Sequence, residues 1–119
     1  MSFEDDPIDI RIKQGATFRL ALNYMDQTKT SYDLNGFTAH MQIRTSSGSL
    51  ICDLTTENGG ITLNEDGVGN IDIYISDEDT AAMNFTSAKY DFFLLYPNGE
   101  RECVFQGKVA FAKAETIHG

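Results

Sequence analysis

Apolar and polar residues alternate strictly along several short segments of the chain. In residues 71–75, for example, three isoleucines alternate with Asp72 and Tyr74. Successive side chains of a β-strand point to opposite faces of a sheet, so each such segment has one apolar face. The pattern predicts an all-β protein, with strands at residues 8–13, 17–25, 37–44, 49–54, 61–63, 69–75, 88–96 and 100–112.

Turn-forming residues separate these segments. The pair Asn98-Gly99 is typical of a tight hairpin turn between the last two strands. Gly107 interrupts the final strand and predicts a bulge or a bend there. One short helix is expected near 77–83, because Ser76 can cap its first turn and the acidic residues that follow favour the positive end of a helix dipole.

The order of elements predicts a single immunoglobulin-like antiparallel β-sandwich of seven to eight strands. A chain of 119 residues has the size of one domain, spanning 1–119, with 1–7 and 113–119 expected to be flexible. The cysteine and tryptophan signature of antibody domains is missing, since the chain contains no tryptophan.

The chain is acidic, with 18 Asp and Glu against 9 Lys and Arg and a net charge of −9. Such a charge repels nucleic-acid phosphates and anionic membrane surfaces, so neither is an expected partner. The charge is interpreted as a means of keeping a protein with many strand edges soluble, and an acidic binding patch is the alternative.

Two cysteines, Cys52 and Cys103, fall on the apolar phase of their segments. They are therefore predicted to be free thiols in the core, with a disulfide as the alternative. The first residues contain no secretory signal pattern, and no stretch approaches the roughly 20 apolar residues of a membrane helix. Synthesis in a reducing cytoplasm is expected.

Few residues suggest chemistry. His40 lies on the polar phase of its strand, and neither it nor His118 has a partner at metal-ligand spacing. The serines lack a nucleophile-elbow setting, and the glycine-rich turns do not open helices as phosphate loops do. Cys103 with His40 as a distant base stays open from the sequence alone. We expect no enzyme activity, no metal and no cofactor.

Large apolar and aromatic residues give two groups of predictions. Four residues occupy the phase opposite to the core and are candidate interface residues: Tyr74, Phe93, Leu95 and Met25. If they lie side by side on one sheet, they form a patch suited to a protein partner; scattered exposure is the alternative. The aromatic residues predicted for the core are Phe18, Tyr24, Phe37, Tyr90, Phe92, Phe105 and Phe111.

Several longer motifs together cover about residues 8–112, and they are the segments 12–18, 32–44, 53–63, 75–83, 99–101 and 106–109. In these motifs the chain resembles a family of small structural proteins of tailed bacteriophages and prophages. The resemblance implies a virion component encoded near tail, baseplate or fibre genes. It identifies no functional residues, because the motifs read as turns and strands of the scaffold.

The expected function is a non-enzymatic virion structural protein, made in the cytoplasm of the bacterial host. It would act as an adaptor in the tail, the baseplate or the fibre-attachment region, by docking on other virion proteins or on further copies of itself. A capsid-surface decoration protein is one alternative. A carbohydrate-binding module that uses Tyr74 and Tyr32 as stacking platforms is another.

Overall fold

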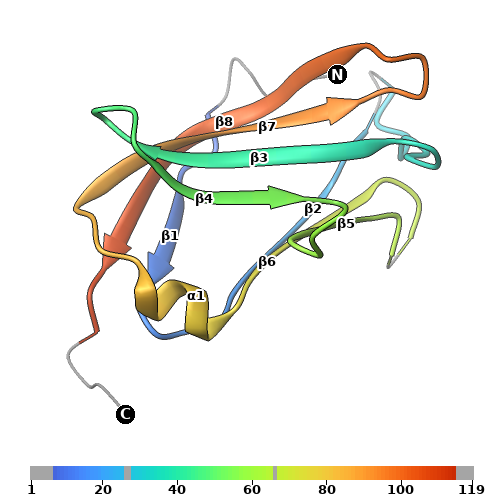
Figure 1. Cartoon of the computed structure of the whole chain (residues 1–119). Helices are drawn as coiled ribbons and strands as arrows, with labels where there is room; N and C mark the ends of the chain where they lie inside the picture. Colours follow the sequence, from blue (N-terminus) through green and yellow to red (C-terminus); the bar gives the residue numbers. More distant parts are fainter. Residues whose placement is uncertain (1–6, 26–27, 66, 115–119) are drawn as a thin grey trace.

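The computed structural model describes residues 7–25, 28–65 and 67–114 of the chain (Figure 1). Within these ranges the elements lie close to the positions that the alternation predicts. They are β1 (Ile10–Lys13), β2 (Phe18–Asn23), β3 (Thr38–Thr45), β4 (Leu50–Thr55), β5 (Ile61–Leu63), β6 (Asn70–Ile75), α1 (Asp77–Ala82), β7 (Ser87–Leu95) and β8 (Arg101–Ala112). The predicted flexibility of 1–7 and 113–119 falls mostly on residues outside the described ranges.

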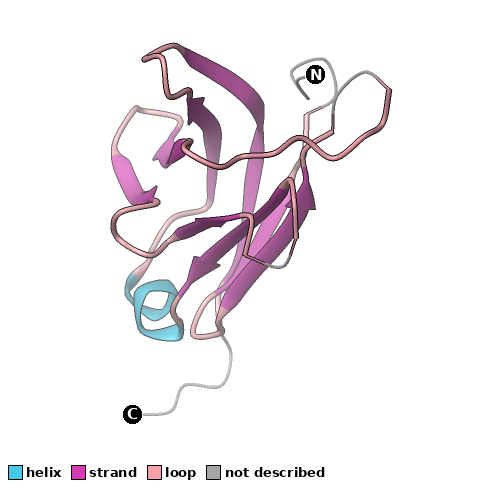
Figure 2. Cartoon of the chain, turned by 90° about the vertical axis from the view of Figure 1, so that its right-hand side faces the viewer, coloured by secondary structure: helices cyan, strands magenta, loops and turns pink. Residues whose placement is uncertain are grey.

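The strands form two sheets that pack as an immunoglobulin-like β-sandwich, which confirms the predicted fold class. One sheet has the order β1-β8-β7-β3-β4 and the other has the order β2-β6-β5. Figure 2 shows the two layers from the side, with α1 at one end. One detail differs from the prediction, because β1 runs parallel to β8. The chain crosses from one sheet to the other between β1 and β2, so β1 pairs with the last strand instead of with its neighbour in sequence.

The core lies between the inner faces of the two sheets. Ile71 and Ile73 of β6 and Met41 of β3 are at most 1% exposed. Phe92 of β7 stacks on Phe105 of β8, with ring centroids 4.5 Å apart. Burying a side chain of this size contributes roughly 1.5–3 kcal/mol to stability. Packing therefore accounts for the inner phase of the strands.

A β-bulge in β8 changes which residues of that strand face the core. Phe92 lies opposite Phe105, but the next residue, Phe93, lies opposite Cys103, so Val104 is the extra residue. Cys103 therefore shares the outward phase of Phe93 and is half-buried. The prediction that Cys103 points into the core was wrong, because a bulge reverses the phase of the residues on one side of it.

Cys52 does lie on the inner phase, as predicted. It sits opposite the buried Ile43, and burial, with a smaller contribution from Asp79, raises the pKa of its thiol to about 11. β3 and β7 separate β4 from β8, so Cys52 and Cys103 are too far apart for a disulfide. Neither cysteine forms a disulfide within the described ranges.

Gly107 marks a close approach of two segments, and the predicted bulge lies at Val104 instead. A side chain at Gly107 would overlap the carbonyl group of Ile8. The Ile8 amide donates a hydrogen bond to the Gln106 carbonyl at 2.9 Å, and the Tyr90 hydroxyl donates to the Ile8 carbonyl. These contacts fix the residues that precede β1 against β8.

The predicted helix and its cap are present as α1. The Ser76 side chain accepts a hydrogen bond from the Asp79 amide at 3.1 Å. The buried Thr80 hydroxyl donates to the Ala16 carbonyl at 2.9 Å, which fastens α1 to the connection between β1 and β2. Among the described residues, no helix is long and apolar enough to cross a membrane.

Candidate interaction surface

The outer face of the five-stranded sheet carries most of the positive charge of the chain. Six of the nine Lys and Arg residues of the chain lie on this face and are exposed. Among the described residues, three aspartates lie on the same face. The whole chain, by contrast, has a net charge of −9. The protein is therefore electrically asymmetric. The cations are Arg11, Lys13, Arg44, Lys89, Arg101 and Lys108, and the aspartates are Asp9, Asp53 and Asp91.

Three of these cations form a row across three neighbouring strands. Arg44 of β3 lies directly opposite Lys89 of β7, and Lys89 lies opposite Lys108 of β8. Like charges placed directly opposite each other destabilise a sheet. Arg44 donates to the Gly48 carbonyl at 3.0 Å and to the Gln42 side chain at 2.9 Å. Neither lysine forms an ion pair within the described ranges, so this cationic row is open to an added negative charge.

The cationic row borders a hollow of about 570 Å³ on the outer face. Pro7 and Asp9 form part of its wall, beside Lys108. The Asp9 carboxylate accepts a hydrogen bond from the Lys108 amide at 3.0 Å, which holds this wall in place. The volume lies within the roughly 300–1,000 Å³ of typical ligand sites, and the lining carries two carboxylates, those of Asp9 and Asp91, beside its three cations. The hollow therefore suits a segment of mixed charge better than a uniformly charged one.

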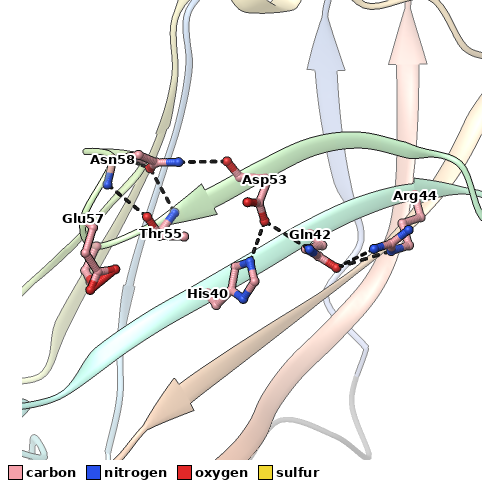
Figure 3. A network of polar contacts seen from close by, with 9 residues as sticks. His40, Gln42, Arg44, Asp53, Thr55, Glu57 and Asn58 are labelled. Atoms are coloured by element: carbon pink, nitrogen blue, oxygen red, sulfur yellow. Dashed lines mark hydrogen bonds and ion pairs between the residues drawn. The ribbon is translucent and has the colours of Figure 1, made fainter.

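A hydrogen-bonded network joins β3 and β4 beside the cationic row (Figure 3). The His40 Nε2 atom lies 2.5 Å from Asp53 Oδ1, and Gln42 donates to the same oxygen at 3.2 Å. The hydrogen bond with His40 holds the pKa of Asp53 below its ordinary value, and the bond from Gln42 adds to this effect. Asp53 is therefore ionised at neutral pH and orients both neighbouring side chains.

These side chains offer hydrogen bonds and charge for binding. His40 and Asp53 resemble two members of a catalytic triad, but within the described ranges no hydroxyl or thiol hydrogen-bonds to His40. Cys103 lies in the same row as His40, with Phe93 of the intervening strand between them. No group of three or more His, Cys, Asp or Glu residues that could hold a metal is found in the part of the chain that the structure describes.

Two of the four predicted interface residues lie on this outer face. Phe93 and Leu95 both occupy the outward phase of β7 and are half-buried. The Arg101 guanidinium lies over the Phe93 ring, with Cζ 4.9 Å from the ring centroid. A cation over an aromatic face is a favourable contact, so Arg101 covers part of the apolar surface that the sequence predicts to be exposed.

The other two predicted residues lie elsewhere. Tyr74 is on the outer face of the three-stranded sheet, 38% exposed, with Arg19 Cζ 4.8 Å from its ring centroid. Met25, also 38% exposed, forms a bridge with Ser31 in the loop after β2. The outer faces of the two sheets point away from each other, so the four residues do not form one patch.

The sequence reasoning missed the cationic row. Its residues fall on the polar phases of the predicted strands 37–44, 88–96 and 100–112, and this was the available signal. The net charge of the chain gave no indication of the cationic row, because a sum over all residues does not show where the charges lie. The alignment of Arg44, Lys89 and Lys108 also depends on strand order and register, which alternation alone does not determine.

Comparison with known proteins gives no family assignment. No family model and no curated protein matches the chain. Among solved structures it is similar to CopC from Methylosinus trichosporium OB3b, at 12% sequence identity. The match covers 92% of this chain and 89% of that chain, with a TM-score of 0.49. A likeness at this level carries no inference to this chain.

Proposed function

We propose that the chain is a non-enzymatic structural protein of a tailed-phage or prophage virion and that it docks on a larger virion protein. Its docking surface is the outer face of the five-stranded sheet. The partner presents a carboxylate-rich surface to this face, in the tail, the baseplate or the fibre-attachment region.

The observation that carries the docking surface is the segregation of charge. Six cations gather on one face of a protein with a net charge of −9. Such a face attracts and orients a negatively charged protein surface, while the acidic remainder of the chain repels it. Phe93 and Leu95 beside the cations supply half-buried apolar area of the kind found in interface centres. Docking through a sheet face is retained from the sequence analysis, with a charged surface in place of an apolar one.

A protein partner fits this face better than a nucleic acid does. Asp91 and the ionised Asp53 lie among the cations, and a phosphate backbone offers no hydrogen-bond donors to pair with these two carboxylates. The net negative charge of the whole chain adds a repulsion of longer range. Mixed charges of this kind match a protein surface that carries carboxylates together with hydrogen-bond donors.

The virion assignment is supported by the sequence resemblance, and its direct test is location. Antibody against the protein is applied to particles from the source strain, and gold label is imaged by electron microscopy. Label at the tail tip or the collar supports the adaptor role. Label spread over the head identifies a decoration protein instead, and unlabelled particles beside antigen in the lysate contradict a virion component.

The carbohydrate alternative is not favoured by the positions of its two rings. Tyr74 is covered by Arg19, and Tyr32 packs edge-on against Tyr24 in a loop, with ring centroids 5.6 Å apart.

The docking surface is tested by charge reversal with a matched control. The double variant Arg44→Glu/Lys89→Glu changes the cationic row, and Arg19→Glu changes an exposed cation on the opposite side of the sandwich. Each purified protein is mixed with source particles that lack it, and the co-sedimenting amount is measured. We expect at least a tenfold weaker association for the double variant and little change for Arg19→Glu. Equal binding of both variants would contradict the proposed surface.

A further inference from the structure

The edge strands of the sandwich differ in how well they are protected against pairing with another chain. In the described part of the chain, the edges are β1 and β4 of one sheet and β2 and β5 of the other. Proteins commonly protect an edge by short length, by charged side chains or by a covering segment. β5 has only three residues, and β1 has four, with Arg11 and Lys13 exposed. β2 has six residues without lysine, proline or a bulge, so it lacks these protections.

The edge of β4 is covered by a side chain from the turn that follows it. The Thr56 amide donates to the Ala39 carbonyl of the segment before β3, so Asp53 and Thr55 turn their backbone groups to the open side. Asn58 Nδ2 donates to the Asp53 carbonyl at 3.0 Å, and the Thr55 amide donates to Asn58 Oδ1 at 2.9 Å. The Asn58 amide group thus makes the contacts that a peptide group of a further strand would make.

The edge of β2 has no such cover. The Tyr24 amide donates to the Gly69 carbonyl on the side of β6. Backbone groups alternate between the two sides of a strand, so Arg19, Ala21 and Asn23 turn theirs away from β6. Within the described ranges, no backbone group of these three residues forms a hydrogen bond on that side. A regular row of donors and acceptors is therefore available to a further strand.

The inner side chains of β2 are also less covered than those of β6. Phe18, Leu20 and Leu22 lie on the inner phase and are half-buried. Ile71 and Ile73 of the neighbouring β6 are at most 1% exposed. A strand added beside β2 would cover the three half-buried side chains while it paired with the open backbone groups. The edge therefore offers apolar area together with hydrogen bonds, as sites of strand addition do.

The sequence of β2 is complementary to a second copy of itself. We propose that two copies of the chain pair through antiparallel β2 strands, with Ala21 facing Ala21 of the second copy. This register places Arg19 opposite Asn23 of the second copy, whereas a register centred on Arg19 would oppose two like charges. On the inner phase, Leu20 lies opposite Leu22 of the second copy. The pairing forms about six backbone hydrogen bonds, in three residue pairs of two bonds each.

This inference goes beyond the proposed function and does not depend on it. The pairing joins two three-stranded sheets edge to edge and uses no residue of the cationic row. Each copy has a net charge of −9, so the two copies repel each other and added salt should tighten the dimer by screening that repulsion. Docking through the cationic row should weaken with salt instead. Ionic strength therefore distinguishes the two contacts.

Sedimentation velocity of the full-length protein over a concentration series measures the dimer. Ala21→Lys places two like charges opposite each other at the centre of the pairing, and Ala110→Lys adds the same charge at an exposed alanine on the outer face of the five-stranded sheet. We expect the unaltered protein to dimerise, with roughly tenfold or more weakening by Ala21→Lys and little change by Ala110→Lys. Urea unfolding checks that both variants fold. A monomer at every concentration, or equal weakening by both variants, would overturn the proposal.

A disulfide tests the register of the pairing. Opposite Cα atoms in an antiparallel hydrogen-bonded pair are about 5.5 Å apart, which is within the range that a disulfide spans. Ala21→Cys should therefore link two copies under mild oxidation, and the matched variant Ala110→Cys should link few. Peptide mass spectrometry separates this bond from any that involves Cys52 or Cys103.

Two outcomes of the disulfide experiment would contradict the pairing. Equal yields from Ala21→Cys and Ala110→Cys would show that the links form by random collision. A dimer that is weakened by Ala21→Lys but forms no disulfide at position 21 would mean that another segment of the second copy occupies the β2 edge.

Discussion

The two outer faces of the sandwich are built by the same alternation but differ in charge. On the three-stranded sheet, the strands present one cation, Arg19, and one anion, Asp72, and the cation lies over the Tyr74 ring. On the five-stranded sheet, six cations outnumber three aspartates, and three of the cations stand directly opposite one another. The first face has the balanced charge of an ordinary solvated surface.

The difference in charge between the two faces separates what stabilises the fold from what would serve binding. A sheet that only needs to stay folded gains nothing from opposing like charges. Surfaces used for binding commonly sacrifice some stability, which is why substitutions there can stabilise a protein while weakening its function. On this basis we propose that the cationic row is a binding feature, and the three-stranded face is the natural control for it.

The largest expected effect separates the two sides of β7. Phe92 is fully buried, so Phe92→Ala should lower the free energy of unfolding by about 3–5 kcal/mol. Phe93 points outward beneath Arg101, so Phe93→Ala should lower it by about 1 kcal/mol or less. Urea unfolding of both variants measures the difference. Equal losses would show that Phe93 belongs to the core and not to the outer face.

The next effect concerns the segment that borders the hollow. Tyr90→Phe removes the hydrogen bond to the Ile8 carbonyl and should cost about 1 kcal/mol at neutral pH. Burial also raises the pKa of Tyr90 above that of the unfolded chain. Its contribution is therefore complete below about pH 10 and is lost as the pH rises above 10 towards the folded-state pKa.

Thermal unfolding between pH 8 and pH 12 tests this linkage. Tyr96 shares the alkaline effect, because its hydrogen bond to Glu102 raises its pKa. The unaltered protein should lose stability steeply above pH 10, and Tyr90→Phe should lose less. An identical pH profile for both proteins would refute the role given to the Tyr90 hydroxyl.

A smaller effect compares single cations on the two faces. Lys89→Gln relieves the repulsion within the cationic row and should raise stability by a few tenths of a kcal/mol. Arg19→Gln removes the contact with Tyr74 and should lower stability by about 0.5–1 kcal/mol. Chemical denaturation at low salt compares the two variants. A loss of stability on Lys89→Gln would mean that the row is already neutralised within the fold.

The smallest effect lies at acidic pH. The pKa of Asp53 is lowered by its hydrogen bond with His40, so this carboxylate stabilises the fold above its unfolded pKa of about 3.8 and loses that effect as the pH falls through its lower folded-state pKa. Asp53→Asn should therefore flatten the stability profile slightly between pH 5 and pH 2. Asp91→Asn, on β7 and separated from Asp53 by β3, is the matched exposed control. If both variants flatten the profile equally, the His40 contact contributes nothing specific.

Local patterns predicted the elements well, because each depends on neighbours in sequence. Alternation located the strands, and Asn98-Gly99 indicated a hairpin turn in which Gly99 has a φ of +93°. The Ser76 cap also follows from adjacent residues alone. Each of these features is stabilised by contacts within a few residues, so a single sequence contains the required information.

Features that depend on pairing between distant strands could not be predicted in this way. The sequence around Val104 does not predict the bulge that places Cys103 on the outer face, because the bulge is defined by the register between β8 and β7. Tyr74 and Phe93 share a phase in the sequence but lie on different sheets. The cationic row is a product of strand order as well, since its three members come from β3, β7 and β8.

The most direct test of the central claim is lysine labelling on assembled particles. Free protein and particle-bound protein are acetylated briefly, and the modified fraction of each lysine is measured by mass spectrometry. The account predicts strong protection of Lys89 and Lys108 on the particle, with Lys29 labelled as in the free protein. Protection of Lys29 with unchanged labelling of Lys89 and Lys108 would show that the protein docks through another surface.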